Sequence, residues 1–224
     1  MACAKQAKKS KKTLIAIPSW MEWKVLFPHI PYKATVQNPH PLSANADASC
    51  VGIGLVDFAS GLSRLIYTQK YNRIILAGVA GALPESGLSS GDIVRVDEEC
   101  AGDIGYWNED AFRPYFKRPH IDKATPSKLA PESIAKLPGV RGISVNTMTA
   151  SKQALEFRAR FFKAKVEAME GATAFVIANA FGIQIFEVRT ISNFTGDLDE
   201  SKWNLKQSLK TLQRQILNPI LEGK

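Results

Sequence analysis

The chain has 224 residues, enough for one α/β domain with a full core, and its 45% hydrophobic and 22% charged residues are those of an ordinary globular protein. Its formal net charge is +8, but five lysines within residues 1–12 supply more than half of that excess. We therefore expect a basic flexible tail over residues 1–12 that aids solubility, with no nucleic-acid partner, and one domain over residues 13–224.

The apolar run after the tail, residues 14–18, is too short for a signal peptide and lacks its cleavage pattern. No later stretch is long and apolar enough to span a membrane, so we expect a cytoplasmic protein without a membrane partner. The three cysteines are far apart, and the three histidines lie in proline-flanked sequence. This excludes a disulfide framework and a metal site, and leaves carboxylates and amides for catalysis without a cofactor.

Short apolar runs rich in β-branched residues predict six strands, over residues 13–17, 49–53, 73–79, 92–97, 142–147 and 184–191. Helical spacing of apolar residues predicts helices over 55–67 and 201–221, and the stretch 172–186 is typical of a buried helix leading into a buried strand. This alternation predicts a single-domain, three-layer α/β/α fold with a central mixed, largely parallel sheet. The proline-rich stretch 106–136 is expected to be a long irregular excursion.

Two glycine-rich segments follow predicted strands, Gly52-Ile53-Gly54 and Gly78-Val79-Ala80-Gly81-Ala82. Glycine lets the backbone approach a sugar closely, and a helix N-terminus offers free N–H groups, although each segment alone fits a tight turn equally well. Two such segments in one sheet favour a nucleoside pocket, with Gly78 as a candidate substrate-binding residue. The sequence lacks a P-loop and the third glycine of a dinucleotide fingerprint.

Glu170 precedes a helix that is apolar from Ala172 through Ala180. A buried carboxylate is costly without partners, and two ribose hydroxyls would provide them. The alternative is that Glu170 only interacts favourably with the N-terminus of its own helix.

Further polar residues stand at the ends of predicted strands. Arg189 would pair with a nearby carboxylate, and Asn193 offers a donor and an acceptor to the N7 and O6 edge of a 6-oxopurine, unless it caps the following loop. Glu22 lies beside apolar neighbours that would raise its pKa toward that of a general base, but it also fits an ordinary helix glutamate.

Together these motifs resemble the purine nucleoside phosphorylase superfamily, in its branch of 5′-methylthioadenosine/S-adenosylhomocysteine nucleosidases and futalosine hydrolases, from residue 13 onward. Three segments resemble futalosine hydrolases in particular: Gly102-Asp103-Ile104-Gly105, Val145-Asn146-Thr147, and Ile191-Ser192-Asn193 followed by Ser201-Lys202-Trp203.

The resemblance implies a role for each of several residues. Glu170, with Met169 beside it, would bind the ribose hydroxyls. Glu22 would activate the attacking water, and Arg189 would help to position that water. Thr147 and Met148 would line the site of the base. Trp203 would form a wall of the pocket for the 5′ substituent. A homodimer is implied as well.

Two positions depart from the methylthioadenosine nucleosidases, since Thr147 replaces a base-stacking phenylalanine and Asn193 replaces an aspartate. An amide cannot supply the proton that departing adenine needs, whereas hypoxanthine delocalises its charge onto O6. We therefore expect hydrolysis of futalosine to hypoxanthine and dehypoxanthine futalosine, a step of menaquinone biosynthesis. The alternative is a methylthioadenosine/S-adenosylhomocysteine or aminofutalosine nucleosidase that releases adenine.

Two other functions agree less well with the sequence. Phosphorolysis would need basic or hydroxyl groups beside the two glycine-rich segments, and none stand there, which favours water as the nucleophile. A catalytically silent protein that binds nucleosides or nucleic acid would share the fold, but it would have no use for Glu22, Glu170 and Arg189 together.

Overall fold

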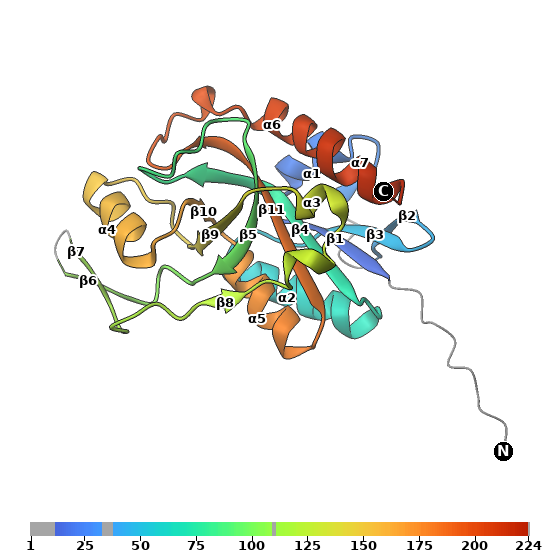
Figure 1. Ribbon diagram of the computed structural model, residues 1–224, viewed down its shortest axis with the longest axis horizontal. Helices are drawn as coiled ribbons and strands as arrows, with labels where there is room; N and C mark the ends of the chain where they lie inside the picture. Colours follow the sequence, from blue (N-terminus) through green and yellow to red (C-terminus); the bar gives the residue numbers. More distant parts are fainter. Residues whose placement is uncertain (1–11, 33–37, 109–110, 224) are drawn as a thin grey trace, which may run out of the picture.

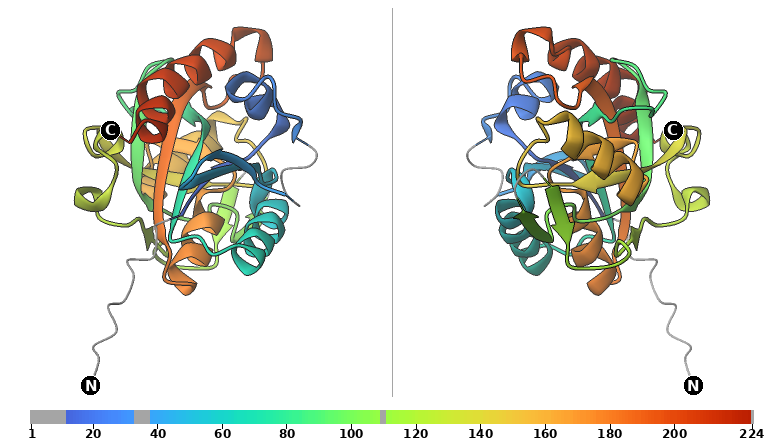
Figure 2. Two further views of the ribbon diagram at one scale, coloured as in Figure 1. Left: turned by 90° about the vertical axis from the view of Figure 1, so that its right-hand side faces the viewer. Right: turned by 90° about the vertical axis from the view of Figure 1, so that its left-hand side faces the viewer.

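The computed structural model describes residues 12–32, 38–108 and 111–223. A nine-stranded mixed sheet lies between two layers of helices (Figures 1 and 2). One layer contains α1 (Trp20–Leu26), α6 (Leu205–Leu212) and α7 (Asn218–Leu221), and the other contains α2 (Gly54–Thr68) and α5 (Gly171–Ala180). The predicted three-layer α/β/α fold is confirmed.

The sheet contains β1 (Thr13–Ile17), β2 (His40–Ser43), β3 (Ala46–Cys50), β4 (Arg73–Ala82), β5 (Ile93–Glu99), β8 (Asp122–Lys123), β9 (Gly139–Ser144), β10 (Val166–Ala168) and β11 (Gln184–Phe194). Its order is β10-β9-β5-β11-β4-β1-β3-β2, with β8 beside β5. β3, β1, β4 and β11 run parallel to one another, whereas β5 is antiparallel to β11. β10 also pairs with the end of β4, so the sheet curls round and brings Glu167 opposite Gly81.

The core consists of two large apolar clusters, one on each face of the sheet. One cluster includes Phe58, Leu62 and Leu65, which lie on one side of α2, and it continues through α5. The other joins α1 and α6 to the opposite face of the sheet. Each fully buried leucine or phenylalanine contributes roughly 1.5–3 kcal/mol, so this burial holds the strand ends in fixed positions.

Several predicted boundaries are wrong. β3 and β9 end three residues before the predicted ends, because the apolar residues Val51 and Val145 are buried in connections that follow the strands. Gly78 to Ala82 lies inside β4 and is not a loop after it. The C-terminal helix is interrupted, since a 3-10 turn at Glu200–Lys202 precedes α6 and a π-helical turn at Gln213–Leu217 follows it.

The excursion over residues 106–136 is not wholly irregular. Strands β6 (Gly105–Asn108) and β7 (Ala111–Pro114) form a two-stranded sheet, and the short helix α3 (Glu132–Ala135) follows a 3-10 turn at Ser127–Leu129. The hairpin lies near α4 (Lys152–Phe162) at one end of the molecule (Figure 1). The sequence does not predict these short elements, because the stretch is rich in charged residues and proline and no element in it has enough residues to show apolar periodicity.

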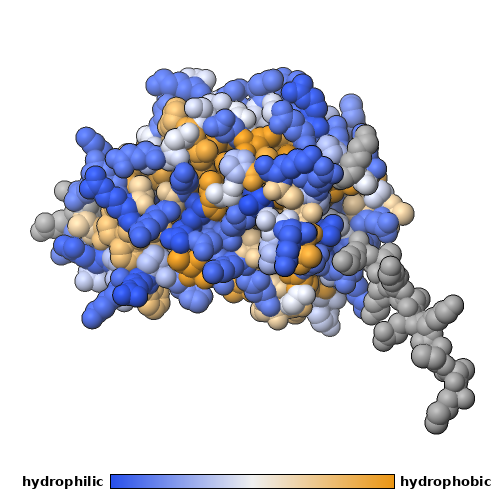
Figure 3. Space-filling view, viewed as in Figure 1, coloured by the Kyte–Doolittle hydropathy of each residue, from blue (hydrophilic) through white to orange (hydrophobic). Residues whose placement is uncertain are grey.

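Most of the predicted basic tail, residues 1–11, lies outside the described residues. Lys12 is described, and its Nζ forms an ion pair of 2.7 Å with Asp47. Within the described ranges, no helix combines the length and hydropathy needed to cross a bilayer. On the face seen in Figure 3, hydrophilic side chains separate the hydrophobic ones into several patches.

Candidate functional site

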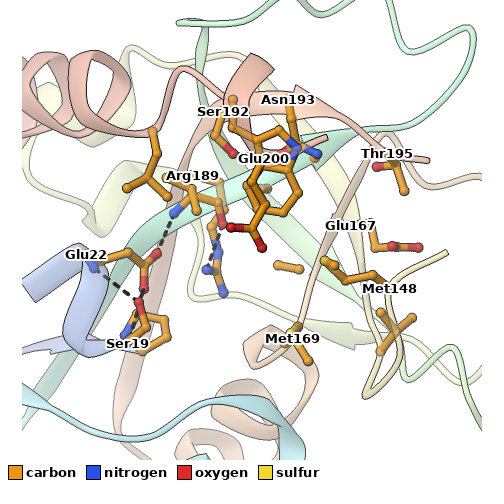
Figure 4. Close-up of a pocket in the computed structure, with 18 of the residues that line it drawn as sticks. Ser19, Glu22, Met148, Glu167, Met169, Arg189, Ser192, Asn193, Thr195 and Glu200 are labelled. Carbon is orange, nitrogen blue, oxygen red and sulfur yellow. Dashed lines mark hydrogen bonds between the residues drawn. The ribbon is translucent and has the colours of Figure 1, made fainter. Parts of the chain in front are cut away.

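A cavity of about 260 Å³ lies beside the carboxyl ends of β1, β4 and β10, against β11. Figure 4 shows Ser19 and Glu22 on one side of it and Met148 and Glu167 on the opposite side. Of the residues singled out by sequence, seven line it: Glu22, Met148, Met169, Glu170, Arg189, Asn193 and Trp203. Residues from distant parts of the chain are thus brought to one place, at the edge of the sheet where such folds bind ligands.

Glu22 is held by neutral donors. Its Oε2 accepts hydrogen bonds from the Ser19 N–H at 2.9 Å and the Ser19 hydroxyl at 2.6 Å, which completes a capping box at the start of α1. Its Oε1 accepts from the Val79 N–H at 2.8 Å. A carboxylate has about four lone-pair sites, so Oε1 keeps one for a further donor such as water. Glu22 is therefore a helix cap and also carries an acceptor that faces the cavity.

The pKa of Glu22 is raised above its ordinary value. Burial is the largest cause, and the negative charge of Glu170 adds to it. The positive charge of Arg189 and the hydrogen bonds from Ser19 and Val79 act in the opposite direction but do not cancel the increase. A carboxylate whose affinity for protons is raised in this way is suited to general base catalysis.

Glu170 is buried directly before α5, yet its side chain does not cap that helix. Its Oε1 accepts from the Gly54 N–H at 3.1 Å, at the N-terminus of α2, and its Oε2 accepts from Arg189 Nη2 at 3.2 Å. The N–H group that sequence reasoning offered to a ligand is thus bound by a protein carboxylate. Glu170 retains lone pairs on both oxygens, as a bidentate contact with a diol requires.

Arg189 lies beside Glu22 and Glu170 and is only 1% exposed. Its Nε donates to Glu187 at 2.7 Å, and its Nη1 donates to the Val79 carbonyl at 3.1 Å. Burial lowers its pKa, but the nearby carboxylates raise it more, so the guanidinium stays charged. The prediction that Arg189 pairs with a carboxylate is met twice, by Glu187 and Glu170.

Gly78 leaves room for this arrangement. A Cβ at Gly78 would lie 2.5 Å from Glu22 Oε1 and 2.9 Å from Arg189 Nη1, distances at which atoms clash. The glycine is therefore required by the protein's own charged groups, whatever it contributes to substrate binding.

Asn193 reaches the cavity through a β-bulge. The pairing of β11 with β4 shifts between Ile191 and Asn193, so both Ser192 and Asn193 line the cavity. The Asn193 Nδ2 donates to the Phe194 carbonyl at 3.1 Å, and the Ser192 hydroxyl donates to Asn193 Oδ1 at 2.7 Å. Because a carbonyl only accepts, these bonds fix which end of the amide is nitrogen, and they leave one N–H and one lone pair for a ligand.

The bulge is supported by the start of the last helical region. The Ser192 carbonyl accepts from the Asn204 N–H at 2.8 Å, and the Ser208 hydroxyl donates to the Ile191 carbonyl at 3.0 Å. Trp203 lies just before these contacts and donates its indole N–H to the Asp197 carbonyl at 2.9 Å. The indole thus has a fixed position in the lining, beside other apolar groups: Met21, Ile53, Leu198 and Leu205.

Thr147 is not part of this cavity. It is exposed and lines a separate depression, and its carbonyl accepts from Arg158 Nη1 at 3.3 Å. Arg158 also pairs with Glu167 at 3.0 Å and with Asp103 at 2.6 Å. The Gly102 to Gly105 motif therefore contributes Asp103 to a clamp on the connection after β9, and the neighbouring Met148 is the residue that reaches the cavity.

Sequence reasoning missed several lining residues. Ser19 was readable, because Ser19 and Glu22 stand at the spacing of a capping box. Ser192 and Glu167 carried no separate signal, because neither a β-bulge nor the ion-pair partner of a buried carboxylate can be recognised from spacing. Among the described residues, no three histidine, cysteine, aspartate or glutamate side chains are grouped to hold a metal. The side chains that line the cavity therefore include a candidate base, Glu22, a buried cation, Arg189, and an amide, Asn193.

Comparison with known proteins identifies the family of the chain. A family model described as "Phosphorylase superfamily" matches residues 48–220. The chain is 30% identical over 195 residues to a futalosine hydrolase of Acidothermus cellulolyticus, covering 78% of each chain.

Two solved structures from Helicobacter pylori share the fold at 19% identity, each covering 96% of this chain and 100% of the other. One is a futalosine hydrolase with a TM-score of 0.77, and the other is a 5′-methylthioadenosine/S-adenosylhomocysteine nucleosidase with a TM-score of 0.75. The resemblance seen in the sequence is confirmed, and the chain belongs to the phosphorylase superfamily.

Proposed function

We propose that this protein is an N-glycosyl hydrolase that cleaves a purine nucleoside, and that its substrate is futalosine. One observation carries the proposal: a buried carboxylate with a spare acceptor, Glu22, a second buried carboxylate with free lone pairs, Glu170, and an amide, Asn193, line one cavity. The relative from Acidothermus cellulolyticus supports futalosine in particular.

Glu170 binds the ribose in this proposal. Gly54 donates a hydrogen bond to one of its oxygens and Arg189 donates to the other, so the carboxylate is already oriented before a substrate arrives. Two hydroxyl donors on adjacent ribose carbons fit its remaining lone pairs. Met169 covers the same part of the cavity and gives the sugar an apolar surface.

Glu22 removes a proton from water as that water attacks the anomeric carbon. The glycosidic C–N bond breaks with its electron pair leaving on the base, and the water oxygen forms the new C–O bond. The ribosyl group carries positive charge while the old bond is stretched, and the carboxylates of Glu22 and Glu170 stabilise that charge. Arg189 keeps Glu170 in place and offers N–H groups that orient the water.

Asn193 stabilises the departing base. Its free N–H donates to the purine edge, where negative charge accumulates on N7 and O6 of hypoxanthine. Adenine has no O6 and needs a proton on N7, which an amide does not supply. This difference favours a 6-oxopurine nucleoside as substrate.

Water is the proposed nucleophile in place of phosphate. Arg189 is the single cationic side chain among the described residues that line the cavity, and it is already paired with Glu170 and Glu187. A phosphate dianion beside Glu22 and Glu170 would meet two negative charges without an available cation, which is unfavourable.

We also propose a homodimer in the cytoplasm. The hairpin of β6 and β7 and its neighbourhood expose several large apolar side chains that a second copy would cover: Ile104, Tyr106, Tyr115 and Phe116. Exposed apolar clusters of this kind are typical of interaction surfaces.

The test is to incubate the purified protein with futalosine and, separately, with 5′-methylthioadenosine, and to identify the released base by chromatography. We expect hypoxanthine from futalosine and at least tenfold slower release of adenine. Asn193→Asp serves as the matched variant and should speed adenine release relative to hypoxanthine. Rapid adenine release with no hypoxanthine would replace futalosine with a methylthioadenosine-type substrate, and release of neither base would refute hydrolysis.

A further inference from the structure

Behind Arg189, away from the groups assigned to the reaction, two more carboxylates are completely buried. Glu99 ends β5, Glu187 lies on β11, and both are 0% exposed. Glu99 Oε1 and Glu187 Oε2 are each buried without a hydrogen-bond partner. An unpartnered buried carboxylate oxygen is costly, so two of them in one place need an explanation.

The two unpartnered oxygens lie beside the same backbone position. Each is 2.5 Å from the position that a Cβ on Gly171 would take, so both converge on the first residue of α5. A Cβ on Gly142 would also clash with Glu99 Oε1. Two glycines thus leave the space that the carboxyl groups occupy, and the two oxygens lie within 5.0 Å of each other.

The other oxygen of each group has a partner, and the two partners differ. Glu187 Oε1 accepts from the charged Arg189 Nε at 2.7 Å. Glu99 Oε2 accepts from the neutral Ser144 hydroxyl at 2.9 Å, and the same hydroxyl accepts from the Ala172 N–H. The cation therefore favours negative charge on Glu187, while Glu99 has only neutral donors.

We propose that Glu99 and Glu187 share one proton in a carboxylic acid to carboxylate hydrogen bond, which lets Arg189 remain oriented by an ionised Glu187. A single O–H···O bond satisfies both unpartnered oxygens. The pair then carries one negative charge in place of two. Glu99 and Glu187 are positioning residues for Arg189, and this part of the inference rests on the proposed function.

The charges that face the pair are consistent with one retained proton. Burial raises the pKa of Glu99 well above its ordinary value, and the charge of Glu187 adds to that rise. Burial raises the pKa of Glu187 as well, but there the charge and the hydrogen bond of Arg189 act against the rise, while the charge of Glu170 adds to it. Burial and the neighbouring Glu99 also raise the pKa of the Cys100 thiol, to about 12, so this adjacent group stays neutral.

Two isosteric variants separate the roles. Glu99→Gln keeps a donor toward Glu187 and should retain kcat within about threefold, because glutamine imitates the protonated acid. Glu187→Gln removes the charge that orients Arg189 and should lower kcat at least tenfold. Equal losses in the two variants would overturn the assignment of the charge to Glu187.

A direct measurement does not depend on catalysis. Infrared spectra of the unliganded protein near neutral pH should contain the C=O stretch of a buried protonated carboxyl group, shifted in D₂O and missing in Glu99→Gln. Unfolding provides a second readout. Since the folded protein keeps a proton that the unfolded chain releases above pH 4.5, wild-type stability should fall as the pH rises above that value, and less steeply in Glu99→Gln.

A spectrum with no such band would overturn the shared proton even if the protein proved to be a futalosine hydrolase. If the band is present but no purine nucleoside is hydrolysed, the proton-sharing pair stands and the proposed function fails.

Discussion

Arg158 on α4 and Arg189 on β11 are both buried, and each forms ion pairs with two carboxylates. Around Arg158 the charges nearly balance, because Asp103 is partly exposed and Glu167 is bound directly by the cation. Around Arg189 the described structure buries several carboxylates for one cation, and Glu22 has only neutral hydrogen-bond donors.

The difference indicates what each cluster does. The Arg158 cluster connects α4, the connection after β9 and the Gly102 to Gly105 motif, so its bonds serve the fold. The Arg189 cluster keeps excess negative charge beside a cavity, at a cost in folding free energy that suits stabilisation of a cationic transition state. The proposed reacting centre is thus distinguished by its unbalanced charge beside a cavity and not by a buried arginine alone.

The largest expected effect comes from Glu22→Gln. The variant keeps the shape of the side chain but cannot accept a proton from water, so kcat should fall by about 10²–10⁴. Single-turnover kinetics measure this loss, and circular dichroism checks that the variant is folded. A kcat within tenfold of wild type would remove Glu22 from the role of base.

Arg158→Met should act mainly on stability. It leaves Glu167 buried without its cation, which costs about 3–5 kcal/mol in the free energy of unfolding. Urea denaturation measures this, with Arg160→Met, an exposed position on the same helix, as a control that should change stability by less than about 0.5 kcal/mol. If kcat of folded Arg158→Met dropped as far as in Glu22→Gln, the contrast between the clusters would fail.

Glu170→Gln tests the ribose contact. Replacing a charged acceptor by a neutral one should cost about 1.5–3 kcal/mol of transition-state binding, or roughly tenfold to 150-fold in kcat/KM. Steady-state kinetics on the nucleoside and on its 2′-deoxy analogue distinguish the contact. The wild type should discriminate strongly against the analogue, and the variant should do so only weakly.

The smallest expected effect is a shift of the acidic limb of the pH–activity profile to higher pH. Glu22 acts as a base only when ionised, and its pKa is raised by burial and by Glu170, so kcat/KM should decline as the pH falls while still above 4.5. A kcat/KM profile taken over the pH range in which circular dichroism shows the folded state measures this limb. A decline centred below pH 4.5 would contradict the raised pKa.

Part of the candidate site was evident in the sequence because the signal was local. Glu170 directly precedes an apolar helix, and Arg189 and Asn193 end an apolar run, so each appeared as an expensive polar group in a buried context. The element order was likewise predictable, since apolar periodicity reflects which face of a helix or strand is buried. Boundaries such as that of β9 were not, because Val145 remains apolar past the point where pairing stops.

Tertiary structure decided how those residues are used. Only the pairing of β11 with β4 places Arg189 opposite Gly78, and only the bulge after Ile191 presents Ser192 and Asn193 to the same cavity. The folded chain also gave Thr147 a place outside the cavity and brought Glu99 to Glu187. The sequence by itself determined which groups are costly to bury, through local composition. Several of their partners lie on other elements, as Gly54 does for Glu170 and Val79 does for Glu22, so the charge balance of each cluster exists only in three dimensions.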